Sequence, residues 1–234
     1  MASEPKRIGE GQVGMNLRYS LQSDDANVPA SVVVKLASPD PISRATGISL
    51  RNYEREVKFY NEIANTLDVR KPHCYFADWH EEGGDIAIVL EDMTPCEQGD
   101  QIRGCGIDEA RISVTELSKL HGPRWGDASL SKIDWLQRRD ADDAARLEGL
   151  YAMVKPGFLA VHGEAIRREC GEEGIAFIET LGTMMTRYVN AKDEPFTVTH
   201  GDYRLDNLLF ATPAGGVACA VVHWQTPGHG NGVA

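Results

Sequence analysis

The sequence predicts an α+β fold with two lobes: an antiparallel sheet with one helix in residues 1–92, and an α-rich lobe in residues 93–234. Three observations support this prediction. Short β-branched runs gather in the first of these regions, and helical spacing of apolar residues dominates from 108 to 190. A strand, a polar loop and further strands then follow at 196–222. Because the strand period and the helix period lie in separate parts of the chain, we expect one lobe built mainly of strands and one built mainly of helices.

Length and charge limit the class of protein. With 234 residues and 42% hydrophobic content the chain can bury a sizeable core. The formal net charge of −11 argues against a surface for nucleic acid or an anionic membrane, because such surfaces need clustered Lys and Arg. No run approaches the roughly 20 apolar residues of a membrane span, and the first residues show no signal or transit pattern. We expect a cytoplasmic globular protein.

The cysteines agree with a reducing compartment. They are odd in number, widely spaced and contain no CxxC pair, so we predict reduced thiols and no zinc site. The five are Cys74, Cys96, Cys105, Cys170 and Cys219.

The first motif is a glycine pattern, IGEGQVG, in which Gly9, Gly11 and Gly14 form GxGxxG. Such a pattern occurs in dinucleotide-binding folds, where it opens a helix, and in kinases, where it joins two strands above the ATP phosphates. It also occurs by chance in flexible surface hairpins. Apolar and polar residues alternate at 17–22, which is a strand period and favours the kinase arrangement.

The second motif is a lysine within an apolar strand. Lys35 lies in SVVVKL at 31–36, where its side chain could simply face solvent on an open sheet. A helix is predicted at about 49–67, and at about 100° per residue Glu56 falls inside its apolar arc. A carboxylate that faces the core needs a partner. The order glycine loop, strand lysine and helix glutamate therefore favours a lysine that reaches the nucleotide phosphates.

Two further strands at 74–79 and 85–90 complete a predicted sheet of about five strands. Glu91 and Met93 follow directly. In a two-lobed nucleotide-binding fold this step is the hinge whose backbone groups meet adenine, so we predict that these residues contact the base.

The second lobe is predicted to be mainly helical. A helix is predicted at 108–121, and helical stretches near 140–153 and 175–190 are expected to be broken at Pro156-Gly157 and at Gly171 to Gly174. His121 lies at the apolar edge of the first helix, and we interpret it as a packed histidine.

The most informative stretch is THGDYRLDNLLF. His200, Asp202 and Asn207 fit HxDxxxxN between the apolar runs 196–199 and 208–210. This spacing suits phosphoryl transfer, in which the aspartate takes a proton from the attacking hydroxyl and the asparagine binds Mg²⁺. The alternative is a polar hairpin turn with a buried histidine.

Together these motifs resemble the aminoglycoside phosphotransferase and choline kinase-like family, in particular its bacterial branch related to ecdysteroid kinase-like proteins. The matching segments are GEGQVG, VVVKL, NYEREVKFYNEIA, LEDM, SKLHGPRW, HGDYRLDNLLF and VVHWQTPG. The resemblance implies a protein-kinase-like fold and transfer of the ATP γ-phosphate, with Mg²⁺, to a hydroxyl of a small molecule. It assigns Asp202 as base, Asn207 as Mg²⁺ ligand, and Lys35, oriented by Glu56, to the phosphates.

The chain departs from the family pattern in two ways. His223 stands where the family has a metal-binding aspartate, and an imidazole should weaken Mg²⁺ binding. The chain also ends 11 residues after His223 and starts close to the glycine loop, so the resemblance predicts that both ends are shortened and that the second lobe lacks helices. A nucleotide-binding pseudokinase or an inactive fragment is therefore the alternative to an active enzyme. The acceptor stays open between an aminoglycoside, a choline-like amine, a sugar and a hydroxy acid.

Overall fold

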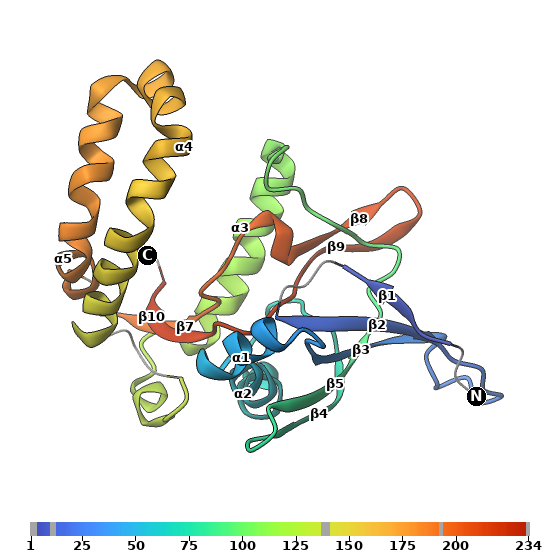
Figure 1. Ribbon diagram of the computed structural model, residues 1–234. Helices are drawn as coiled ribbons and strands as arrows, with labels where there is room; N and C mark the ends of the chain where they lie inside the picture. The colour runs from blue at the N-terminus through green and yellow to red at the C-terminus, as the bar shows by residue number, and fades with distance from the viewer. Residues whose placement is uncertain (1–3, 10–12, 137–140, 192–193, 233–234) are drawn as a thin grey trace.

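The structure is a computed structural model that describes residues 4–9, 13–136, 141–191 and 194–232. Figure 1 shows a sheet with two helices beside it, a second group of strands around a helix, and a long helical hairpin that projects from the body. Within the described residues no helix is long and apolar enough to cross a membrane.

The N-terminal part is a five-stranded sheet with the order β1-β2-β3-β5-β4, in which all neighbours are antiparallel. The β-branched run predicted as a strand is its centre, so Lys35 lies between Asn16 and Ile88 of the neighbouring strands. The strands are β1 (Lys6–Ile8), β2 (Gly14–Ser20), β3 (Ser31–Ala37), β4 (Cys74–His80) and β5 (Asp85–Glu91).

The helix predicted at about 49–67 is present from Asn52 to Thr66, and the prediction missed a separate helix before it. Helix α1 (Pro41–Ser49) begins after Asp40, whose side chain accepts a hydrogen bond from the backbone of Ser43 at 2.8 Å. Helix α2 (Asn52–Lys58) then starts after Arg51, which adopts a left-handed conformation with a φ of 56° and separates the two helices. A π-helical turn (Phe59–Ile63) and a 3₁₀ turn (Ala64–Thr66) extend α2.

The second part combines helices with short strands. β6, β8 and β9 form one small sheet, and β7 pairs with β10 in another. The elements are β6 (Glu97–Gln98), α3 (Ile107–His121), α4 (Ala141–Leu181), α5 (Met185–Asn190), β7 (Phe196–Thr199), β8 (Leu208–Thr212), β9 (Gly215–Val221) and β10 (Gly228–Asn231). Short 3₁₀ turns lie at Gly122–Arg124, Ala128–Lys132, Gly182–Met184 and Leu205–Asn207.

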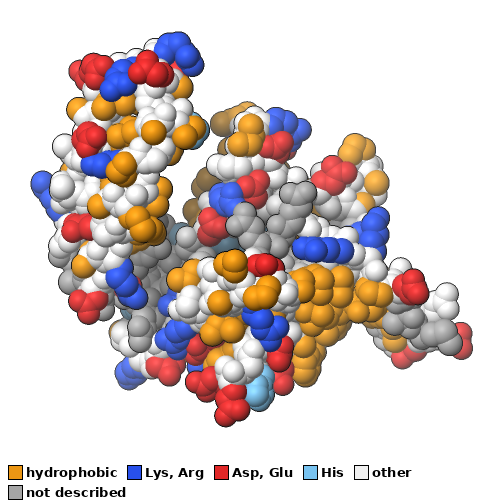
Figure 2. Space-filling model, viewed as in Figure 1, with side chains coloured by type: hydrophobic (Ala, Val, Ile, Leu, Met, Phe, Trp, Pro, Cys, Tyr) orange, Lys and Arg blue, Asp and Glu red, His pale blue; other side chains and the backbone are white. Residues whose placement is uncertain are grey.

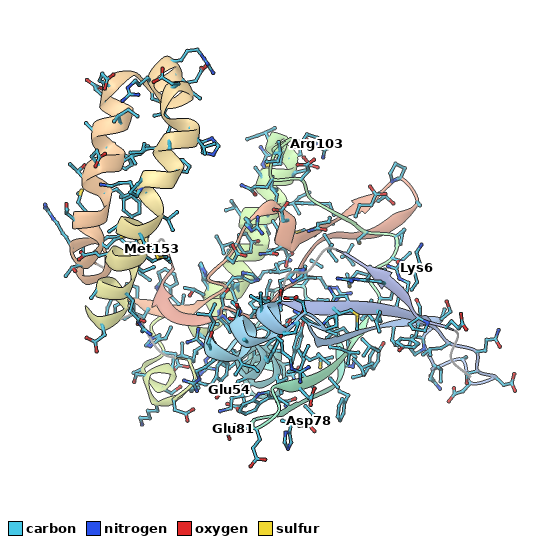
Figure 3. The ribbon with its side chains drawn as sticks, viewed as in Figure 1. Lys6, Glu54, Asp78, Glu81, Arg103 and Met153 are labelled. Carbon is cyan, nitrogen blue, oxygen red and sulfur yellow. The ribbon has the colours of Figure 1, made fainter. Side chains whose placement is uncertain are left out.

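Helix α4 is a hairpin of two arms. The predicted break at Pro156-Gly157 is wrong, because the helix continues through Pro156, whereas Gly171 has a φ of 67° and a ψ of −170° and reverses the chain. The Tyr151 hydroxyl donates to the carbonyl of Ile178 at 2.6 Å across the two arms. Hydrophobic side chains are visible along the hairpin in Figure 2, and Met153, labelled in Figure 3, is 72% exposed.

One hydrophobic core joins the two parts. It includes Ile88 of the first sheet together with Leu208 and Trp224 from the C-terminal strands and the loop after them. Phe59 from the π-helical turn stacks on Trp224, with ring centroids 4.0 Å apart and an interplanar angle of 7°. The helix that carries Glu56 therefore packs directly against the segment that carries His223.

Candidate active site

Lys35 and Glu56 form a buried ion pair between β3 and α2. The lysine Nζ lies 2.8 Å from Oε1 and 2.6 Å from Oε2 of the carboxylate, and the two residues are 4% and 1% exposed. The pairing results from the helical arc that turns Glu56 toward the sheet. Removing one partner of such a pair destabilises the fold, because the remaining charge would be buried without a counter-charge.

The last glycine of the motif, Gly14, lies beside this ion pair. A Cβ on Gly14 would meet the Cε of Lys35 at 3.2 Å and the carbonyl of Leu36 at 3.3 Å, so the glycine lets the lysine stem pass close to β2. Gly9 has a φ of 67° and lines the cleft described below. Gly11 lies outside the described residues.

A cleft with a volume of about 180 Å³ opens between the two parts. Its lining includes Lys35, Glu56 and His223, together with Glu91 at the end of β5 and Met93 after it. A larger cavity of about 610 Å³, bounded by Gly126–Leu136 and Glu194–Phe196 among others, contains none of the predicted site residues among its described walls.

At the predicted hinge the Glu91 carboxylate accepts hydrogen bonds from two other residues of the chain. Arg70 lies 2.6 Å from its Oε1, and the His73 backbone donates to Oε2 at 2.9 Å. Burial alone would raise the pKa of Glu91, but these hydrogen bonds outweigh it and lower the pKa. Within the part of the chain that the structure describes, the backbone N–H of Met93 has no hydrogen-bond partner. A backbone donor at this edge is therefore available to a ligand.

Asp202 and Asn207 lie together after β7. The Asn207 amide donates to the Asp202 carboxylate at 2.8 Å and to its carbonyl at 2.7 Å. Half of the Asp202 side chain is exposed, whereas Asn207 is 5% exposed. The asparagine thus holds a carboxylate that is open to solvent, which is the arrangement a proton acceptor needs.

His200 is a buried support of this loop. Its Nδ1 accepts from the Asp202 backbone at 3.3 Å, so Nε2 carries the proton and donates to the carbonyl of Val222 at 2.9 Å. Burial lowers the pKa of His200, which keeps the ring neutral. The buried histidine of the alternative interpretation is therefore present, and it orients the backbone at Asp202.

His223 lies in the same cleft as Lys35. Its φ of 66° places it in the left-handed region, which His, Asn and Asp adopt more often than other non-glycine residues. Burial, reinforced by repulsion from Lys35, lowers the pKa of His223 from 6.5 to about 3. The ring is therefore neutral at physiological pH.

These donors do not fit Mg²⁺ held by the protein. In the described part of the chain no group of three or more His, Cys, Asp and Glu side chains is placed to hold a metal ion. Asn207 offers one amide oxygen, while His223 offers a ring nitrogen. Mg²⁺ demands near-octahedral oxygen ligands and gives up its water reluctantly, so a neutral nitrogen donor is a poor ligand for it.

Sequence reasoning missed several residues around the site. Arg204 lies 3.2 Å from Asp202 and also pairs with Asp206. Tyr53, counted only as an apolar helix position, uses its hydroxyl to donate to the Val13 carbonyl and to accept from the Ser38 backbone at 3.3 Å. These contacts join segments far apart in sequence, and the only signal for Tyr53 was that a buried tyrosine needs a hydrogen-bond partner.

The five-stranded antiparallel sheet with its helices and the helix-rich second part have the fold of solved aminoglycoside phosphotransferases, which confirms the predicted fold class. Three solved structures are similar. An aminoglycoside 2′-phosphotransferase-IIIa point mutant in complex with GDP aligns with a TM-score of 0.60 and 10% identity, over 99% of this chain and 69% of that one. A GDP and kanamycin complex of APH(2″)-IIIa aligns with a TM-score of 0.57 and 10% identity, over 99% and 70%.

The third is a protein from Ralstonia eutropha described as a candidate aminoglycoside phosphotransferase. It aligns with a TM-score of 0.54 and 15% identity, over 99% of this chain and 61% of that one. The chain thus spans between about three fifths and seven tenths of these proteins. No family model and no curated protein sequence matches the chain. At these identities the likeness establishes the fold.

Proposed function

We propose that the protein is a cytoplasmic phosphotransferase that moves the γ-phosphate of ATP to a hydroxyl of a small molecule. Residues 1–92 would bind the nucleotide, and residues 93–234 would carry the catalytic loop at 200–207. The observation that carries the proposal is the buried Lys35–Glu56 ion pair, which lines one cleft with the free backbone donor of Met93.

In this proposal the residues act by positioning and proton transfer. Met93, with Glu91 beside it, contacts the base, and Gly9, Gly11 and Gly14 lie over the phosphates. Lys35, held by Glu56, pairs with the α- and β-phosphates. The acceptor oxygen attacks the γ-phosphorus, the bond to the β-phosphate oxygen breaks, and the hydroxyl proton passes to Asp202. Asn207 keeps that carboxylate oriented through its 2.8 Å hydrogen bond.

The proposed class of phosphate acceptor is supported by a structural neighbour and by the net charge of the chain. One neighbour holds kanamycin, an aminoglycoside, together with GDP. The net charge of −11 is compatible with a cationic acceptor and disfavours nucleic acid and anionic membranes as partners. We therefore propose a hydroxylated small molecule, with amine-bearing acceptors as the first to assay.

Replacing Asp202 tests the proposed step. Asp202→Asn keeps an oxygen for the Asn207 amide but cannot take a proton, so we expect transfer from γ-labelled ATP to fall by about 10²-fold or more while ATP affinity stays within about twofold. Asp202→Ala should lose as much. The assay compares kanamycin with a panel of amines and sugars. An Asp202→Asn form as active as the parent would remove Asp202 from the mechanism.

A second function is favoured by His223. Mg²⁺ is the cation that the resemblance implies, yet the donors at Asn207 and His223 do not fit it, so the chain could bind nucleotide without efficient transfer, as a pseudokinase. His223→Asp separates the two functions. Aspartate tolerates the left-handed backbone already present, and the variant should raise Mg²⁺-dependent turnover. Equal turnover in both forms would show that His223 does not limit the reaction.

A further inference from the structure

The first arm of helix α4 carries an apolar stripe that the described part of the chain leaves uncovered. Its members recur at helical spacing, so at about 100° per residue they fall within one arc of the helix. They are between 44% and 75% exposed, and hydrophobic side chains are visible along the hairpin in Figure 2. The stripe consists of Leu150, Met153, Val154, Phe158 and Val161. Five large apolar side chains on one helix face indicate a surface that packs against another protein.

The stripe is centred on a different side of the arm from the contacts between the two arms. Tyr151 donates to a carbonyl of the second arm, and Lys155 pairs with Glu179 there. These two residues lie about 100° and 140° around the helix from Leu150, whereas the stripe spans from about −60° to about 80°. Gly157 falls inside the stripe at about −20° and has nothing within 4 Å of an added Cβ. The backbone at the middle of the stripe is therefore open to a close neighbour.

Charged side chains stand at both ends of the stripe. Asp143 and Arg146 precede it, and Glu164 and Arg168 follow it. All four fall within the same arc of the helix. Each takes part in an exposed or partly exposed ion pair with a neighbour at most three residues away, and such pairs contribute little. These charges can therefore exchange their local partners for partners on another molecule.

We propose that two copies of the chain dimerise through this stripe, with their first arms antiparallel. When the pair is centred at positions 155–156, Leu150 faces Val161 of the second copy. The same register places Met153 opposite Phe158 of the second copy. The contact is self-complementary, as a two-fold homodimer interface requires. It does not rest on the proposed function, because none of these residues is among those that line the nucleotide cleft.

The register that pairs the apolar side chains also pairs opposite charges. Asp143 faces Arg168 of the second copy, and Arg146 comes within one residue of facing Glu164. A parallel pair would instead place each of these charges opposite the same charge of the second copy, which is unfavourable. The contact from 143 to 168 extends over about seven helical turns. The order of the charges along the arm therefore favours an antiparallel second copy as the occupant of this face.

Sedimentation equilibrium of the full chain, from about 1 to 100 µM, measures the dissociation constant of the dimer. Val161→Glu places a carboxylate in the apolar contact twice, once from each copy, so we expect the dissociation constant to rise at least about tenfold. Ile102→Glu is the matched control: its side chain is 97% exposed and lies outside the hairpin, so the dimer should be unchanged. Circular dichroism and thermal melting establish that each variant keeps its fold.

Charge reversal tests the antiparallel register. Arg168→Glu places a carboxylate opposite Asp143 of the second copy, so we expect weaker dimerisation at low salt. Asp143→Arg alone should weaken it as well, because two arginines then face each other. The double variant with both substitutions restores opposite charges in reversed order, and its dissociation constant should return to within about threefold of the parent value.

A parent that is dimeric, sensitive to Val161→Glu and rescued by the double charge reversal supports the proposal. A parent that stays monomeric at about 100 µM overturns it and leaves this face to a different partner. A dimer that Val161→Glu leaves intact also overturns it, because the copies then meet elsewhere. Weakening by both single charge reversals without recovery in the double variant overturns the antiparallel register.

Discussion

At the scale of single residues, two backbones in the left-handed region shape the loops of the candidate active site. Gly201 has a φ of 80°, and a Cβ there would lie 2.1 Å from the Thr226 carbonyl oxygen. His223 has a φ of 66°. Both positions follow a β-strand by two residues, where the chain turns sharply before Asp202 and at His223, which lines the cleft.

We predict that Gly201→Ala destabilises the protein by more than about 2 kcal/mol, because the clash with Thr226 adds to the cost of the strained backbone. Urea unfolding measures the change. Gly149→Ala is the matched control: Gly149 lies in α4 with nothing within 4 Å of an added Cβ, and the same substitution there should stabilise by about 0.5–1 kcal/mol. Equal effects at both positions would contradict the crowding at Gly201.

The lowered pKa of His223 predicts how the stability of the protein depends on pH. Because its pKa is about 3 in the folded chain and 6.5 as the ordinary value, the unfolded chain takes up the proton first as pH falls. Stability is therefore lost from about pH 6.5 downward, until the folded state is protonated too. Between pH 7.5 and pH 5 the loss due to this residue is about 2 kcal/mol.

His223→Gln should remove that part of the pH dependence. Urea unfolding of both forms at several pH values measures it, and His200, whose pKa is also lowered, contributes to both forms alike. Parallel stability curves for the parent and the variant would show that the His223 ring is more solvated than the structure indicates.

At the scale of elements, Tyr53 links three segments close to the Lys35–Glu56 ion pair. It lies on α2 three residues before Glu56, and its hydroxyl contacts Val13, next to Gly14, and Ser38, at the end of the strand that carries Lys35. The side chain is 1% exposed. One hydroxyl therefore ties the start of β2, the end of β3 and the helix together.

Tyr53→Phe removes both hydrogen bonds while it keeps the packed ring. We predict a loss of about 1–3 kcal/mol in the free energy of unfolding and a weaker affinity for ATP, because the Val13 carbonyl and the Ser38 amide lose their partner. Tyr75→Phe, on a side chain that is 47% exposed, should change neither quantity. Unfolding in urea and titration with a fluorescent ATP analogue measure the two effects; unchanged affinity would limit Tyr53 to a structural role.

Some of these elements could be predicted from the sequence alone, and others could not. The strand around Lys35 and the inward position of Glu56 follow from local periodicity, so both could be predicted. The separation of α1 from α2 could not, because it depends on a left-handed Arg51, a residue type with no special preference for that conformation. Helix α4 passes Pro156 because contacts between its two arms, such as the one between Tyr151 and Ile178, outweigh one lost backbone bond.

At the scale of the whole molecule, the core runs without interruption from the first sheet to the C-terminal strands. Phe59 and Trp224 stack across the boundary, and Ile88 and Val221 belong to the same buried cluster. The boundary between 92 and 93 stays a prediction, and because the core crosses it we expect the packed parts to unfold together.

A nucleotide that binds the cleft should consequently raise the stability of the whole core. At ATP concentrations about 100 times the dissociation constant the gain is about 2.7 kcal/mol, which corresponds to about 5–10 °C in melting temperature for a chain of this size. Thermal melting across an ATP titration tests this in the parent. In a Lys35→Met, Glu56→Gln double variant, which removes both buried charges together, we expect the shift to fall to less than half. An equal shift in both forms would place the nucleotide outside the cleft, since a ligand bound there must feel the loss of the lysine charge.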